Sequence, residues 1–107
     1  MKFDIELARL ILLDLQDAPP TISYYDITLD GYTEEQISYH VMLLYQADFT
    51  GAIEMSTQGK FKWKPTNLTW EGHKFIEAAN DDNVWNKFKN ILRAKGVQSP
   101  LKQVKHY

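Results

Sequence analysis

Three lysines alternate with two aromatic residues in the segment GKFKWKP, residues 59–65. Alternation is the period of a β-strand, so one face of this strand would carry Phe61 and Trp63 toward a core and the other would carry only amines. The outward positions are Lys60, Lys62 and Lys64. Amines in such a row can bind the phosphates of a nucleic-acid backbone. Lysines also protect exposed edge strands from pairing with another chain, so both interpretations stay open.

A second set of candidate side chains belongs to a helix expected from Thr33 to about Ala47. Its apolar stripe would face the core at Ile37, Val41 and Leu44. The opposite side would present Ser38, Tyr39, Met42 and Gln46. These side chains could read bases in a DNA groove, although the helix lacks the arginine that makes the commonest guanine contact. Glu34 and Glu35 in its first turn would repel phosphates, but acids at that position also stabilise the helix dipole.

The same helix also suits protein contact. A surface containing Tyr39, Met42 and Leu43 resembles interface cores, which are enriched in aromatic and methionine residues. Burial of these side chains within the protein itself is the other possibility. The helix therefore leaves nucleic-acid reading, protein binding and packing open.

A basic amphipathic helix is expected over residues 83–95. Lys87 and Arg93 on its polar side are further candidates for contact with nucleic acid. Trp85 and Phe88 offer an apolar face that would pack on the domain or form a homodimer. Residues 96–107 are expected to be a flexible basic tail.

Charge is distributed unevenly along the 107 residues. Residues 1–59 carry two basic and ten acidic side chains, a net charge of -8, whereas residues 83–107 carry six basic side chains and no acid. An anionic partner such as double-stranded DNA should therefore meet the second half of the chain.

Catalysis and cofactor binding have little support in the sequence. His40, His73 and His106 are far apart and make no metal-ligand spacing, and there is no glycine-rich phosphate loop. Without cysteine there is neither a disulfide nor a thiolate metal site, and no apolar stretch approaches the roughly 18 residues of a membrane span. We therefore expect a cytoplasmic, non-enzymatic protein without a cofactor and without membrane insertion.

The order of the expected elements defines an α+β fold. A helix over residues 4–16 precedes a short strand over 22–29, the helix from Thr33 follows with a TEEQ capping box, and a hairpin turns near Gln58-Gly59 and ends at Pro65. A helix capped by Thr69, with Phe75, Ile76 and Ala79 inward, precedes the last helix. Helix, strand, helix, hairpin and C-terminal helices form the order of a winged helix-turn-helix-like domain, here residues 1–95.

Two segments also resemble a known family. GYTEEQISYHVMLL and NLTWEGHKFIEAANDDNVWNKFK are similar to short phage and prophage proteins grouped as domain of unknown function 2513. The resemblance covers residues 2–95 and implies a winged-helix-like fold and a bacterial or phage source. It names no catalytic residue.

Two hypotheses follow from the sequence. The first is a small DNA-binding transcriptional regulator that contacts phosphates through the lysines of a hairpin wing. The second is a non-enzymatic protein-interaction module, a host-protein binder or adaptor, on the same frame.

Overall fold

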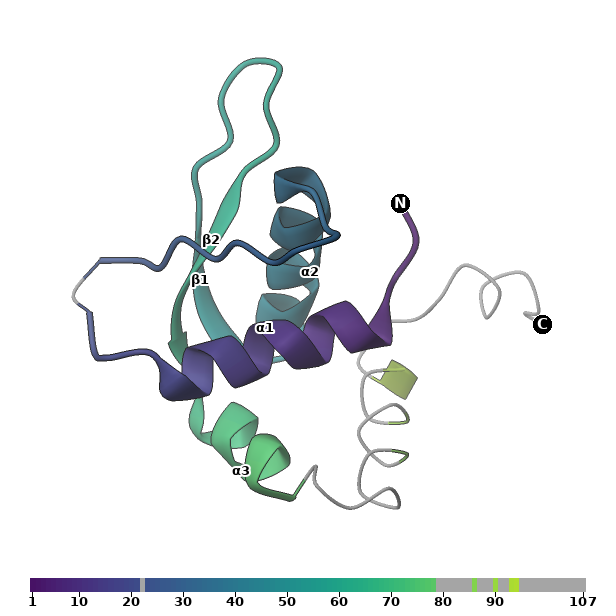
Figure 1. Ribbon diagram of the computed structural model, residues 1–107, viewed down its shortest axis with the longest axis vertical. Helices are drawn as coiled ribbons and strands as arrows, with labels where there is room; N and C mark the ends of the chain where they lie inside the picture. Colours follow the sequence, from purple (N-terminus) through teal and green to yellow (C-terminus); the bar gives the residue numbers. More distant parts are fainter. Residues whose placement is uncertain (22, 79–85, 87–89, 91–92, 95–107) are drawn as a thin grey trace.

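The fold combines three helices with one antiparallel pair of strands across the described residues (Figure 1). The computed structural model describes residues 1–21, 23–78, 86, 90, 93 and 94. In chain order, the elements are α1 (Ile5–Asp17), α2 (Glu34–Gln46), β1 (Thr50–Glu54), β2 (Trp63–Leu68) and α3 (Trp70–Ala78). The α+β class expected from the sequence is therefore confirmed.

Helix α1 lies within one residue of its predicted bounds. Asp4 caps it, because its carboxylate accepts hydrogen bonds from the backbone N–H groups of Glu6 at 3.0 Å and Leu7 at 3.2 Å. The helix ends before Pro19, which cannot continue it. Its buried residues are Leu7, Ala8, Ile11, Leu12 and Leu15. The predicted helical spacing of apolar residues therefore forms one side of the core.

Helix α2 begins with the predicted capping box. The Thr33 hydroxyl accepts from the N–H of Gln36 at 3.1 Å, and the Gln36 side chain accepts from the N–H of Thr33 at 2.8 Å. Both acids expected in the first turn, Glu34 and Glu35, are there. The local sequence thus fixes where this helix starts.

The prediction of which side of α2 faces solvent is wrong in part. Ser38 is only 1% exposed and Leu43 is also buried, while Tyr39 and Met42 are half-buried against the core. Gln46 is exposed, as expected. The reason is that α2 contacts α1 as well as both strands, so it has packing partners on more than one side.

The hairpin turns where the sequence predicts. Strands β1 and β2 pair antiparallel, Thr57 and Lys60 bridge nearer the tip, and Gly59 adopts a φ of 78° in the turn. Trp63 is half-buried against the core, but Phe61 stays 36% exposed, so only one of the two aromatic residues follows its expected orientation. The alternation predicted the strand only in part, because β2 begins at Trp63, and it predicted the burial of Phe61 wrongly.

Pro65 does not end the hairpin as expected. Strand β2 continues through it to Leu68, and the register shifts so that Ala52 faces Pro65 while Gly51 faces Asn67. The intervening residue has no partner, which is a β-bulge. Proline is tolerated in strands at bulges and edges, where its missing N–H is not required.

The strand expected over residues 22–29 is not formed in its described part, residues 23–29. This segment runs across the hairpin (Figure 1) and donates one backbone hydrogen bond, from the N–H of Tyr25 to the carbonyl of Pro65 at 2.8 Å. An antiparallel hydrogen-bonded pair exchanges two such bonds, but Pro65 has no N–H to return one. Ile27 nevertheless packs into the core from this segment.

Helix α3 begins as predicted. The Thr69 hydroxyl accepts from the N–H of Gly72 at 3.1 Å. Ile76 is buried, and the Phe75 ring packs edge-on against Phe49 with 4.6 Å between ring centroids. Ala79, most of the helix expected over residues 83–95 and the tail over 96–107 lie outside the described residues, as does the proposed domain boundary at residue 95.

Candidate nucleic-acid interface

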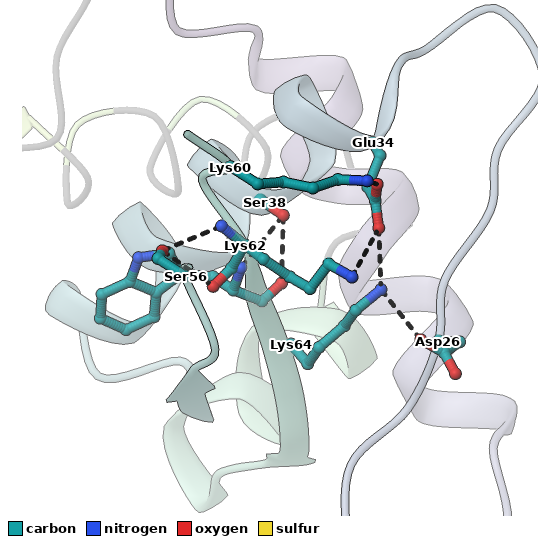
Figure 2. A network of polar contacts seen from close by, with 8 residues as sticks. Asp26, Glu34, Ser38, Ser56, Lys60, Lys62 and Lys64 are labelled. Carbon is teal, nitrogen blue, oxygen red and sulfur yellow. Dashed lines mark hydrogen bonds and ion pairs between the residues drawn. The ribbon is translucent and has the colours of Figure 1, made fainter. Parts of the chain in front are cut away.

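The three lysine side chains of the hairpin converge on one carboxylate, that of Glu34 (Figure 2). Its Oε1 lies 3.8 Å from Nζ of Lys60, and its Oε2 lies 3.7 Å from Nζ of Lys62 and 3.5 Å from Nζ of Lys64. Glu34 is the first residue of α2, so these ion pairs connect the beginning of this helix to the hairpin. The predicted row of lysines is therefore an ion-pair cluster.

The three amines differ in how freely they meet water. The side chains of Lys60, Lys62 and Lys64 are 61%, 30% and 12% exposed. Lys64 also forms a tight pair with Asp26, whose Oδ1 lies 2.9 Å from its Nζ. The expectation that all three amines point outward is thus wrong for Lys64, because the segment that carries Asp26 passes over this side of the hairpin (Figure 2).

The charges of the cluster shift two pKa values. The positive charge of Lys62, assisted by Lys60 and Lys64, lowers the pKa of Glu34 below its ordinary value despite partial desolvation. Burial acts to lower the pKa of Lys64, but the hydrogen bond and charge of Asp26, together with Glu34, outweigh it and raise that pKa. Both groups are therefore held in their charged forms at neutral pH.

Two serines fix the course of the hairpin beneath the amines. The Ser38 hydroxyl accepts from the N–H of Trp63 at 3.1 Å and donates to the carbonyl of the same residue at 3.3 Å. The Ser56 hydroxyl does the same for Lys62, at 2.9 and 3.3 Å. Ser38 is therefore a positioning residue that ties β2 to α2, which the helical spacing alone could not reveal.

A cavity of about 310 Å³ lies beside the cluster. Four charged residues line it, together with uncharged residues such as Tyr32: Asp26, Asp30, Glu34 and Lys64. Three acids against one lysine leave the wall of this cavity with a net negative charge. Within the cluster, the side chains of Asp26, Lys60 and Glu34 are the most exposed, at 72%, 61% and 47%.

Comparison with known sequences places the chain in a family. The family model described as "Hypothetical protein (DUF2513)" matches residues 2–98, which is most of the chain. The chain belongs to the DUF2513 family. An uncharacterized protein of Haemophilus influenzae is 32% identical over 108 residues, covering 98% of this chain and 90% of the relative. No solved structure matches. The resemblance noted from the two sequence segments is thereby confirmed at the level of the family.

The remaining candidate residues of this DUF2513 member do not join the cluster in the part that the structure describes. Tyr39 and Met42 pack on the core, and Gln46 is exposed on the last turn of α2. Arg93 is exposed and donates to the Asn90 side chain at 3.2 Å, whereas Lys87 lies outside the described residues. The hairpin lysines are thus the one predicted set that the described residues bring together.

One histidine has a defined structural role. His40 is buried, its Nε2 accepts from the N–H of Asp4 at 2.8 Å, and its Nδ1 donates to the carbonyl of Gln36 at 2.7 Å. The ring stacks on Phe3 with 5.5 Å between centroids. Burial lowers the pKa of His40. This side chain joins the start of α1 to α2 in its neutral form.

Among residues 1–21, 23–78, 86, 90, 93 and 94, no three histidine or acidic side chains gather closely enough to hold a metal ion. Over the same residues, no helix is long and apolar enough to span a membrane.

Proposed function

We propose that this chain is a small DNA-binding regulator of winged-helix type, of phage or prophage origin and acting in the bacterial cytoplasm. The hairpin is its wing, and Lys60 and Lys62 contact phosphates. The observation that carries the proposal is the placement of these amines on a hairpin whose loop projects beyond the helices (Figure 1). A projecting basic strand pair can follow a phosphate backbone or enter a groove.

The packing of α2 argues for phosphate contact rather than base reading. Ser38 is buried and bound to β2, and Tyr39 and Met42 pack on the core. The acids of the first turn, Glu34 and Glu35, would meet the duplex first if this helix entered a groove. We therefore propose DNA binding with weak sequence preference. Of the four side chains expected on the outward side of α2, Gln46 is the exposed one that could contact a base.

Fluorescence anisotropy of a labelled random-sequence duplex, titrated at several salt concentrations, tests the proposal. Two phosphate contacts per chain give a log-log slope of about -2, from roughly -0.9 per neutralised phosphate. A homodimer through the helix expected over residues 83–95 would double the slope to about -4. Lys64 is not counted among the phosphate contacts because its amine is paired with the carboxylate of Asp26.

A double substitution tests the residues. Lys60→Gln with Lys62→Gln removes two charges without placing like charges near Glu34, and should abolish binding at moderate salt. The matched control is Lys2→Gln with Lys74→Gln, which changes the net charge equally but away from the hairpin: Lys2 precedes α1, and Lys74 pairs with Glu71 on α3. Equal losses of affinity in the two variants would refute a specific role for the wing.

Absence of duplex binding by the unmodified chain, even at low salt, would favour the protein-interaction alternative. Exposed apolar side chains offer contact area for that role. Trp70 at the start of α3 is 74% exposed and Tyr45 on α2 is 45% exposed.

A further inference from the structure

We propose that the Glu34 carboxylate occupies, in the free protein, the place that a phosphate group takes in the complex. The cluster is then an anion site closed by the protein's own side chain. For nucleic acid, this inference rests on the proposed function. For a free phosphate compound, it stands independently, because the amines and the carboxylate are defined by the structure alone.

The geometry resembles the contact that lysines make with a phosphate. Both oxygens of one carboxylate face amines, with Lys60 on one side and Lys62 and Lys64 on the other (Figure 2). A phosphate group likewise presents charged oxygens in several directions, to which lysine binds as a point charge. Three amines that already share one anion are therefore preorganised for another.

The distances indicate that Glu34 is replaceable. Its three contacts span 3.5 to 3.8 Å, longer than the 2.7–2.9 Å of strong charge-assisted hydrogen bonds. Only Asp26 reaches that range, at 2.9 Å from Lys64. Asp26 thus holds Lys64 in place, whereas Glu34 attracts the amines without locking them.

Glu34 is also open to water, although its side chain is less exposed than that of Asp26, at 72%. The Glu34 side chain is 47% exposed and that of Lys60 is 61% exposed, so water and an incoming anion reach both partners. Exposed ion pairs contribute little to stability and are readily exchanged. Removing the Glu34 charge should therefore free the amines of Lys60 and Lys62 without unfolding the protein.

The local charge balance explains why Glu34 would restrain binding. Three amines face two carboxylates, those of Glu34 and Asp26, which leaves one excess positive charge. Neutralising Glu34 raises this excess to two. It also removes the repulsion between this carboxylate and the incoming phosphate.

The test compares Glu34→Gln with Glu35→Gln. The two variants change the net charge identically and affect neighbouring residues of the same helical turn, but Glu35 forms no ion pair among the described residues. In the duplex titration, Glu34→Gln should bind about tenfold more tightly than the unmodified chain, and Glu35→Gln about twofold or less, since a general change of charge acts on both. Equal affinities of the two variants would overturn the inference.

A second readout separates this inference from the proposed function. Inorganic pyrophosphate is titrated into each protein while the NMR shifts of amides 33–36 and 60–64 are followed. If no form binds duplex, the proposed function fails. Pyrophosphate-dependent shifts in Glu34→Gln that are stronger than those in Glu35→Gln then still support the anion site, and equal or absent shifts overturn it.

Folding of the variant is checked by circular dichroism. Should Glu34→Gln unfold, Glu34→Asp keeps the charge and the helix-terminal acid but shortens the side chain by one methylene, which withdraws the carboxylate from the amines. Tighter pyrophosphate binding by Glu34→Asp than by the unmodified chain supports the inference at unchanged net charge. Weaker or equal binding overturns it.

Discussion

Ser38 and Ser56 allow a direct measurement of what burial adds to the same pair of hydrogen bonds. Each hydroxyl accepts from the N–H and donates to the carbonyl of one hairpin residue, Trp63 for Ser38 and Lys62 for Ser56. Ser38 is 1% exposed, whereas Ser56 lies on the exposed hairpin arm. The hydroxyl contacts are therefore matched and the solvent differs, although the carbonyl of Lys62 also accepts from the N–H of Met55 at 2.8 Å.

Ser38→Ala should lower the free energy of unfolding by about 2 kcal/mol. It leaves two backbone groups of Trp63 without a partner, and a buried unsatisfied polar group costs about 1–3 kcal/mol. For the N–H and the carbonyl of Trp63 we take the lower end of this range, about 1 kcal/mol each, because Trp63 is only half-buried. The cavity left by one oxygen adds little, because the methyl group of alanine fills most of the site.

Ser56→Ala should cost less than about 0.5 kcal/mol, because water replaces the hydroxyl at an exposed site. Urea denaturation followed by circular dichroism gives both values, and a constant dependence on urea concentration confirms that the folded and unfolded states are comparable. Equal losses in the two variants, or a loss for Ser38→Ala below about 0.5 kcal/mol, would refute the reasoning.

Two further predictions concern the core. The pKa of His40 lies below its ordinary value because of burial, so the unfolded chain binds a proton more readily; the free energy of unfolding should be highest above about pH 6.5 and fall as the pH drops from there toward the folded-state pKa. Urea midpoints between pH 8 and pH 5 measure this, and an identical pH profile in His40→Gln would contradict it. Gly72→Ala should lower stability by about 1–3 kcal/mol, since the new methyl group would overlap the carbonyl oxygen of Phe49 and the side chain of Leu68. An unchanged thermal midpoint would show that α3 can shift to accept it.

Local signals in the sequence predicted the described helices and the hairpin. The capping residues Asp4, Thr33 and Thr69 each stand at the start of a helix, and Gly59 provides the turn of the hairpin. Of these, Thr33, Thr69 and the turn are predicted by residue type and short spacing, which act over a few positions. That is why these features were recoverable without knowledge of the tertiary structure.

The errors arose where distant segments meet. The outward side of α2 was misjudged because a single-stripe pattern assumes one packing face, whereas the hairpin covers Ser38 from 25 positions further along the chain. The strand expected over residues 22–29 is not formed in its described part, because the neighbouring strand places Pro65 opposite it and proline has no N–H to donate. The pairing of Lys60, Lys62 and Lys64 with Glu34 joins residues that alternation and helix capping had explained separately. The candidate site was thus predicted as a list of residues but not as a cluster.

Thr69 also closes the base of the hairpin. Its hydroxyl donates to the carbonyl of Asp48 at 2.7 Å, and its N–H donates to the carbonyl of Phe49 at 3.1 Å, while the same hydroxyl caps α3. The two ends of the hairpin are therefore pinned together independently of its length. Insertions or deletions near Gln58 would lengthen or shorten the projecting arm without displacing α3, since loop length itself has only a small entropic cost. The reach of the arm can in this way diverge between relatives while the helical body stays the same.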